Sequence, residues 1–322
     1  IQLAIFGFFG GLMAGQMNAQ FGLDLPWYVW TLIAWALVLA LSLASVDIGA
    51  KLLGVLMGLE LLSLLVVGLA VVFSGGGPEG FDLAASFAPA NIFVGGFAGS
   101  AGIALAFAFA SYIGFEATAL YGEEAKEPHK TVPRATYVAV IVITVLFALT
   151  AWAIVSGLGT SVVIERVVEL STVDGVPLAD PAQALFAVAS EYVGSWLATV
   201  MAWLVVSSLF AGLLAFQNSA ARYFFAMGRA GVLPRKLDHV NRSGAPVWAS
   251  VTTSAFTLIV IVIFIVQNLD PIINMFFWFS GMTVVAIVFV EMLVCLAVII
   301  FFRREPLDRR PWNTIIAPAL AF

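Results

Sequence analysis

Long apolar runs dominate the sequence. They cover approximately residues 1–20, 27–46, 50–73, 96–121, 135–158, 194–226, 246–267 and 271–301, and another begins near residue 312. A helix needs about 20 residues to cross the hydrocarbon core of a bilayer. The strands of a membrane barrel alternate in polarity over about ten residues, whereas these runs are continuous. The chain is therefore predicted to be an all-α polytopic membrane protein.

The composition agrees with a lipid surrounding. Hydrophobic residues make up 62% of the chain and charged residues 10%, against about 25% charged residues in an ordinary globular protein. This excludes a soluble enzyme and leaves no basic surface for a nucleic acid. The expected location is the plasma or inner membrane, with the bilayer as the surrounding partner. The sequence does not indicate an oligomeric state.

The basic residues fall almost entirely on one side of the predicted topology. If every run crosses once, one set of loops holds 13 of the 14 Lys and Arg residues and the opposite set holds only Arg166. Basic residues are retained on the cytoplasmic side. The loops 21–26, 74–95, 160–193 and 267–271 are therefore predicted to lie outside.

Two of the outer connections are long. The stretch 74–95 contains Gly and Pro, and the stretch 160–193 is acidic. Either loop is long enough for external helical pieces, and a plain solvated connection is the alternative. Asp180 followed by Pro181 resembles an N-cap and a helix start.

The ends of the chain resemble the interior of a longer protein. Residue 1 is Ile, the first run is already membrane-like, and residues 315–322 are apolar. We expect both ends to be cut through spanning helices. The first run lacks a basic segment and a cleavage site, so it is not a signal peptide.

The run 96–121 contains groups that are costly beside lipid. Ser111, Gly114 and Glu116 lie deep within it. Such a helix is tolerated if it unwinds against a cavity, where freed backbone groups bind a substrate. Close packing of small residues is the alternative reading.

Two segments resemble a known family. The sequence SYIGFE at 111–116, followed by GEEAKEPHKTVPR at 122–134, is similar to the sixth helix and following loop of the amino acid–polyamine–organocation (APC) permeases. The sequence NSAARYFFAMGRAGVLP at 218–234, continuing to GAP at 244–246, is similar to the end of that family's eighth helix and the next loop. The resemblance extends over essentially the whole chain.

The resemblance implies a leucine-transporter-like fold, in which five helices and five more form an inverted repeat. The complete runs correspond to the family's third to tenth helices, so the chain is expected to be truncated at both ends. Residues 1–73 are then a remnant of the first repeat, 74–301 the second repeat, and 302–322 a cytoplasmic loop with the start of a further helix. The first broken helix, which supplies much of the site for the substrate's α-carboxylate, is expected to be missing.

The family pattern also implies a substrate site at the break of the 96–121 helix. Main-chain groups there would meet the amino group of an amino acid or related amine. Ala110 stands where some members have a large gating aromatic residue, which puts an aromatic lid in doubt. The implied substrate-binding residues are Phe109, Ala110, Ser111, Tyr112, Ile113 and Gly114.

Three carboxylates lie within predicted spans, namely Glu60, Glu116 and Glu291. Intramembrane ionisable residues often mark ion or proton pathways. Glu116 is the first candidate for gating or proton sensing, while Glu291 is more simply read as half of a helix-interface pair. Ser207 and Ser208 lie near where sodium-coupled members of the wider fold supply hydroxyl ligands. We therefore hypothesise that Glu60 approaches Ser207 or Ser208 to form a proton or sodium site.

The function implied is secondary active transport of amino acids or related amines, by alternating access, with proton coupling, sodium coupling or exchange. A transporter-like amino acid sensor that moves nothing is the alternative. No catalytic motif or Cys/His cluster is present, so an enzyme is not expected, and neither is a bound cofactor other than a coupling H⁺ or Na⁺. Cys295 is read as a packing residue.

Overall fold

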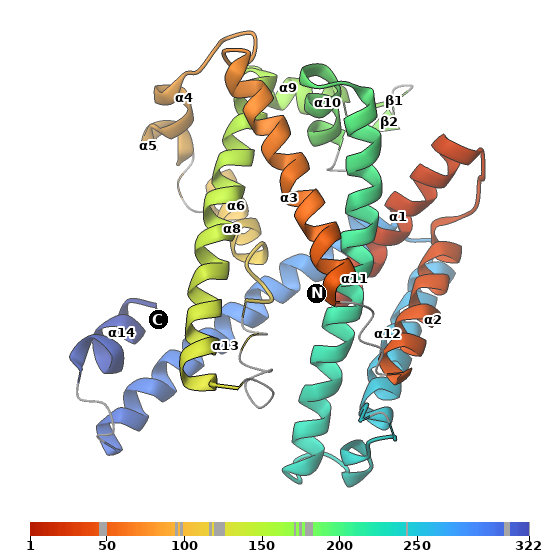
Figure 1. The fold of residues 1–322 in the computed structure, drawn as a ribbon, viewed down its shortest axis with the longest axis vertical. Helices are drawn as coiled ribbons and strands as arrows, with labels where there is room; N and C mark the ends of the chain where they lie inside the picture. Colours follow the sequence, from red (N-terminus) through yellow and green to blue (C-terminus); the bar gives the residue numbers. More distant parts are fainter. Residues whose placement is uncertain are drawn as a thin grey trace.

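The computed structural model describes residues 1–44, 50–93, 96, 99–115, 118, 126–170, 172–173, 176–177, 183–242, 244–305 and 310–321, and this part of the chain is almost entirely helical (Figure 1). The longer helices are α1 (Gln2–Phe21), α2 (Trp27–Ala44), α3 (Ala50–Phe73), α6 (Ser100–Ala110), α8 (Pro128–Leu158), α11 (Ser195–Arg229), α12 (Val247–Val266) and α13 (Phe277–Arg304). The shorter helices are α4 (Leu83–Phe87), α5 (Pro89–Ile92), α9 (Val163–Leu170), α10 (Gln183–Tyr192), η2 (Arg235–Asp238), η3 (Pro271–Phe276), η4 (Trp312–Ile316) and α14 (Ala317–Ala321). Strands β1 (Thr172–Val173) and β2 (Val176–Pro177) pair antiparallel.

The membrane prediction is confirmed. Among the described residues, six helical segments are long and apolar enough to cross a bilayer: 27–44, 54–73, 128–158, 195–229, 247–266 and 271–304. Within the predicted run 96–121, the described residues include helix α6, which ends at Ala110 and is followed by a turn over 111–115. The predicted run 1–20 is a full helix, α1, but it is too polar to be counted with the six because it carries Gln and Asn.

The first half of α1 is packed within the bundle. Its buried face packs against α2, α11 and η3, so the bundle rather than lipid surrounds much of it. Gly7 lies directly against the π-helical turn η3, where a methyl group would overlap the carbonyl oxygen of Pro271. Gly10 lies equally close to the hydroxyl of Thr31 on α2. These glycines let the backbones approach closely, as small residues do in membrane bundles.

We expect Gly7→Ala to lower the stability of the protein by about 1–3 kcal/mol, because the added methyl group forces α1 and η3 apart. Gly15→Ala on the same helix is the matched control, since nothing lies within 4 Å of its added methyl group. Thermal denaturation of both variants in detergent checks this prediction. Equal midpoints for the two variants would show that the close approach at Gly7 is not required.

Two apolar clusters share α11. The first joins α1, α2, α11, α12 and η3 and includes Phe6, Val38, Leu213, Ile261 and Met275, all at most 1% exposed. The second joins the outer parts of α3 and α8 with α10 and α11, around Val71, Val188 and Met201. Helix α11 therefore connects the two halves of the packed structure.

A buried polar network reinforces the first cluster at one end. The Ser42 hydroxyl of α2 donates to Asn218 Oδ1 of α11 at 2.9 Å, so the Ser250 hydroxyl of α12, 3.3 Å away, must donate to Ser42. Gln217 Nε2 donates to the Ser250 carbonyl at 3.0 Å, and Gln2 Nε2 of α1 donates to Gln217 Oε1 at 2.9 Å. Gln217 is only 1% exposed. Because each of these groups has a partner, the network stabilises the four-helix arrangement instead of destabilising it.

The predicted outer loops do contain helical pieces. The stretch 74–95 folds into α4 and α5, and the stretch 160–193 contains α9 and α10. Figure 1 shows α4, α9 and α10 together at one end, with the turn between α11 and α12 at the opposite end. The proposed N-cap at Asp180 and Pro181 lies outside the described residues, and α10 begins at Gln183.

Candidate functional site

Helix α6 ends at Ala110, where the sequence predicted a break. The amides of Tyr112 and Ile113 turn to carbonyls three residues back, at 3.1 and 3.2 Å, so the chain tightens after the helix. Gly114 then has φ +116°, a conformation that L-residues with a side chain rarely adopt. The Ser111 hydroxyl donates to the Phe107 carbonyl at 3.0 Å. The regular helix therefore ends inside an apolar run, and the chain continues as a hydrogen-bonded turn.

Helix α8 holds the turn in place. The Tyr112 hydroxyl lies 2.7 Å from the Thr144 hydroxyl, and its ring packs edge-on against Phe147 at 6.5 Å between centroids. Thr118, beyond the turn, lies 2.6 Å from the Thr136 hydroxyl. Hydroxyl contacts thus join the segment 112–118 to α8 at both ends of the site.

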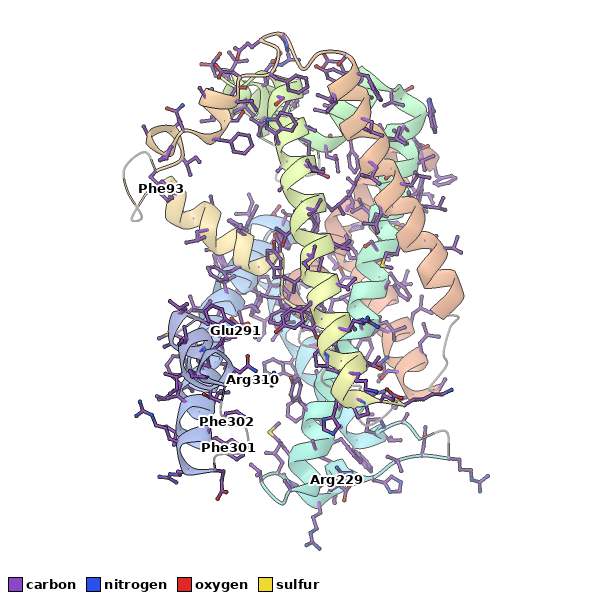
Figure 2. The ribbon with its side chains drawn as sticks, turned by 60° about the vertical axis from the view of Figure 1, so that its left-hand side comes forward. Phe93, Arg229, Glu291, Phe301, Phe302 and Arg310 are labelled. Atoms are coloured by element: carbon purple, nitrogen blue, oxygen red, sulfur yellow. The ribbon has the colours of Figure 1, made fainter. Side chains whose placement is uncertain are left out.

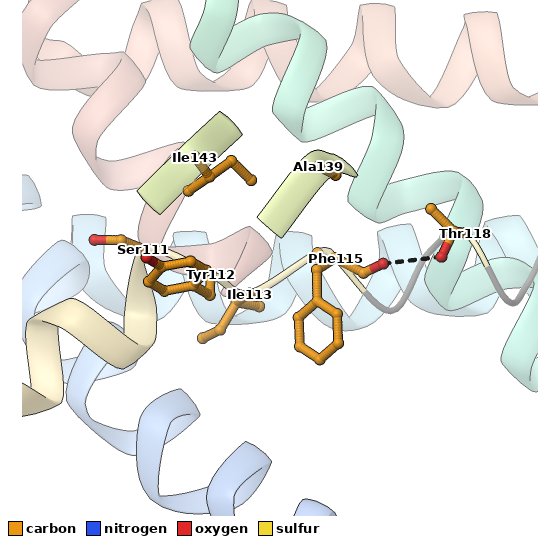
Figure 3. Close-up of a pocket in the computed structure, with 8 residues that line it drawn as sticks. Ser111, Tyr112, Ile113, Phe115, Thr118, Ala139 and Ile143 are labelled. Carbon is orange, nitrogen blue, oxygen red and sulfur yellow. Dashed lines mark hydrogen bonds between the residues drawn. The ribbon is translucent and has the colours of Figure 1, made fainter. Parts of the chain in front are cut away.

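A pocket of about 340 Å³ lies between the turn and α8 (Figure 3). Small-molecule sites typically have volumes of about 300–1,000 Å³ and apolar walls with a few polar groups. Here the polar groups are the Ser111, Tyr112 and Thr118 hydroxyls and the main chain of the turn, and the rest of the wall is apolar. The lining residues are Ser111, Tyr112, Ile113, Gly114, Phe115, Thr118, Ala139 and Ile143.

Four of the six predicted substrate-binding residues line the pocket. Ser111 to Gly114 line the pocket, whereas Phe109 and Ala110 do not, and Phe109 is 47% exposed on α6. Glu116, the predicted gating residue, lies outside the described residues. The prediction omitted four lining residues, Phe115, Thr118, Ala139 and Ile143. Ala139 and Ile143 are four residues apart and so share one face of α8, but their sequence does not show which helix that face meets.

Helix α3 brings Glu60 to α11. The Glu60 side chain is half-buried and lies near the Ser208 side chain of α11. Ser207 does not share this contact, because its hydroxyl donates to the Leu204 carbonyl of its own helix at 2.8 Å. The structure therefore brings together Glu60 and Ser208 but not Glu60 and Ser207. Whether the pair holds an ion stays a prediction.

The pair and the pocket are both in contact with α11. Phe216 of α11 approaches the turn, with its Cζ atom 3.9 Å from the position that a Cβ on Gly114 would take. Ser208 lies about two turns, or about 12 Å, along the helix from Phe216. A movement of α11 would therefore affect both places.

Glu291 lies on α13 and is half-buried (Figure 2). It has an interaction partner within the chain, as does Arg310, which lies near it in the same view. Cys295, one turn further on α13, is a free and partly buried thiol. Among the residues that the structure describes, no group of three or more His, Cys, Asp or Glu side chains is placed to hold a metal ion.

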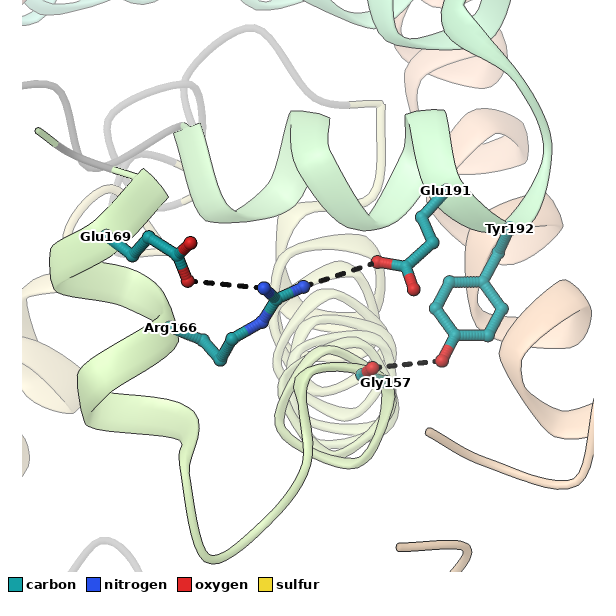
Figure 4. Close-up of polar contacts among 5 residues, drawn as sticks. All are labelled: Gly157, Arg166, Glu169, Glu191 and Tyr192. Atoms are coloured by element: carbon teal, nitrogen blue, oxygen red, sulfur yellow. Dashed lines mark hydrogen bonds and ion pairs between the residues drawn. The ribbon is translucent and has the colours of Figure 1, made fainter. Parts of the chain in front are cut away.

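A set of polar contacts closes the outer end of the bundle (Figure 4). Arg166 of α9 pairs with Glu169 at 3.2 Å and with Glu191 of α10 at 3.9 Å. The Tyr192 hydroxyl donates to the Gly157 carbonyl at 2.9 Å, and burial raises the pKa of this hydroxyl. The arginine pairs are partly exposed and contribute little stability, but they fix α9 against α10.

Glu79 makes a second outer contact. Its carboxylate accepts hydrogen bonds from the hydroxyl and the amide of Ser161, the latter at 2.9 Å. These bonds, the one from the hydroxyl first, hold the pKa of Glu79 below its usual range. The contact thus links the loop after α3 to the turn before α9.

Because the folded-state pKa of Glu79 is lowered, its contribution to stability is present above the unfolded pKa of about 4.3 and is lost as the pH falls through the lower folded value. We expect wild-type protein to be more thermostable than Glu79→Gln at pH 7. This difference should shrink on acidification below about pH 4.3. Melting curves of both proteins from pH 7 to pH 3 check it, and a difference that stays constant with pH would contradict it.

The known proteins that this chain resembles are permeases or transporters. A family model described as amino acid permease matches residues 1–322. The chain is 30% identical over 168 residues to a protein named branched-chain amino acid permease BcaP from Lactococcus lactis, a match that covers 52% of this chain and 33% of that protein. It is 29% identical over 166 residues to an uncharacterized transporter from Legionella pneumophila, covering 52% of this chain and 32% of that protein. The matched stretch thus spans about a third of each relative.

Proposed function

Because the chain belongs to the amino acid permease family, we propose that the complete protein is a secondary active transporter of amino acids or related amines. It works by alternating access in a plasma or inner membrane, with proton coupling, sodium coupling or exchange. Family membership points to a transporter rather than an enzyme. The six membrane-length helices place the chain in a bilayer.

The interrupted helix at 110–115 is the observation that carries this proposal. It combines unwound backbone with three side-chain hydroxyls in one pocket of about 340 Å³. Freed main-chain groups in a broken membrane helix suit the charged ends of an amino acid. The pocket walls at Ile113, Phe115 and Ile143 suit its side chain.

The apolar walls support a substrate with an apolar side chain. Among the described residues that line the pocket, none is charged and most are apolar, which suits an apolar substrate side chain. The name of the Lactococcus relative, a branched-chain amino acid permease, points the same way. We therefore take leucine, isoleucine and valine as the leading substrates.

Two further roles complete the proposal. Glu60 with Ser208 is the candidate coupling site for H⁺ or Na⁺, since a carboxylate and a hydroxyl are oxygen ligands that suit a hard cation. Glu116 keeps its proposed role in gating or proton sensing. Ala110 ends α6 without a bulky ring, so the proposal includes no aromatic lid at this position.

A thermal-shift screen of the full-length protein tests the site. A ligand that binds the folded state raises the midpoint of unfolding, by an amount that grows with its concentration over Kd. We expect leucine, isoleucine and valine to raise it and lysine, glutamate and putrescine to leave it unchanged.

A matched pair of variants locates the binding. Ala139→Phe fills the pocket and should abolish the shift by leucine, whereas Ala135→Phe, one turn earlier on an exposed part of α8, should retain it. An unchanged shift in Ala139→Phe would place the amino acid elsewhere.

A further inference from the structure

The connection between α11 and α12 is folded rather than loose. The Leu237 side chain of η2 is 8% exposed and packs on Gly228 of α11, where an added Cβ would lie 2.9 Å from the Leu237 Cβ. Asn241 Nδ2 donates to the Leu43 carbonyl at the end of α2 at 2.7 Å. The Val247 amide donates to the His239 carbonyl at 3.2 Å. Three anchors on α11, α2 and α12 therefore fix this connection.

The same segment is strongly basic. Residues 222–246 contain five Lys or Arg residues and one acidic residue, Asp238. The side chains of Arg235, Lys236 and Arg242 are exposed. All three belong to the connection that these anchors fix. Arg229 projects from the same end of the molecule (Figure 2).

Apolar side chains are interleaved with these charges. Val232 is 72% exposed, Tyr223 50% and Val240 44%. Helix α11 has 35 residues and so a length of about 52 Å, which exceeds the hydrocarbon core of about 30 Å. Its last turns therefore reach the headgroup layer, where Tyr is favoured and exposed apolar residues can enter the acyl boundary.

We propose that residues 230–242 of this connection form a preformed binding site for the headgroup of an anionic phospholipid. Arg235, Lys236 and Arg242 meet the phosphodiester, and Val232 enters the boundary of the acyl chains. Clusters of basic residues next to a membrane helix attract anionic lipids, and a fixed loop loses little conformational entropy on binding. This site is independent of substrate transport.

Native mass spectrometry of the purified full-length protein tests the proposal. The protein is titrated with phosphatidylglycerol and with phosphatidylcholine of the same acyl chains. We expect phosphatidylglycerol to bind preferentially. The triple variant Arg235→Gln, Lys236→Gln, Arg242→Gln should weaken this binding by about fivefold per charge, or about a hundredfold in total, and leave phosphatidylcholine unchanged.

The matched control is the triple variant Lys126→Gln, Lys130→Gln, Arg134→Gln, which removes three charges at and just before the start of α8. Because these residues lie outside the proposed site, phosphatidylglycerol binding should change by less than one contact, or about fivefold. Equal losses in the two triple variants would show a general charge effect and overturn the site. Equal binding of the two lipids, or full displacement by inorganic phosphate, would also overturn it.

The single variant Val232→Asp tests the site without removing its charges. A carboxylate next to the phosphodiester should lower phosphatidylglycerol affinity at least fivefold. Unchanged affinity in this variant would contradict the proposed orientation of the loop toward the bilayer, even if the triple variant failed to fold.

Discussion

Gly114→Val is expected to reduce amino acid uptake by the full-length protein at least about fivefold. With φ +116°, Gly114 has a backbone conformation that a β-branched residue cannot adopt without strain. Strain of about 1–3 kcal/mol corresponds to about a 5- to 150-fold loss of the turn that lines the pocket. Uptake of labelled leucine into proteoliposomes measures the effect.

This variant separates conformation from packing. The nearest side-chain atom to an added Cβ at Gly114 is Phe216 Cζ at 3.9 Å, so the substitution has room. Gly281→Ala on α13 is the control, because it adds a methyl group in open space within a regular helix. Full uptake by Gly114→Val would show that the turn at 111–115 does not form the substrate site.

Glu60→Gln is expected to abolish ion-driven accumulation while leaving substrate binding in place. The amide has nearly the same shape as the carboxyl group but cannot exchange a proton or neutralise a sodium ion. We expect accumulation to fall at least tenfold and to lose its dependence on pH or sodium, because buried charges in membranes couple strongly to ions. Uptake across pH and sodium concentration, beside leucine-dependent thermal shift, separates coupling from binding.

The neighbouring serines provide matched controls for Glu60. Ser208→Ala removes the hydroxyl near Glu60 and should reduce accumulation several-fold. Ser207→Ala should have little effect, since its hydroxyl is engaged within α11. Unchanged uptake and ion dependence in Glu60→Gln would exclude this pair as the coupling site.

The sequence predicted which segments form helices better than it predicted how those helices pack together. Continuous apolar length predicted the spanning helices, and Ser111 with Gly114 predicted the interruption of α6. The polarity of α1 could not be interpreted from its own sequence. Gln2 is accommodated in the bundle because it bonds with Gln217, more than two hundred residues away.

Only the part of the candidate site that is continuous in sequence could be predicted. Ser111 to Gly114 follow each other in sequence, whereas Ala139 and Ile143 join them through the packing of α8, for which local sequence contains no signal. The choice between Ser207 and Ser208 shows the same limit. Adjacent residues of a helix point about 100° apart, so only the arrangement of α3 against α11 decides which serine meets Glu60.

The most direct test of the transport proposal is flux by the full-length protein in liposomes. We predict saturable accumulation of leucine above equilibrium under an imposed proton or sodium gradient, or counterflow against internal leucine if the protein is an exchanger. An ionophore should abolish gradient-driven accumulation. Saturable leucine binding with neither accumulation nor counterflow would contradict the account and identify the protein as a sensor.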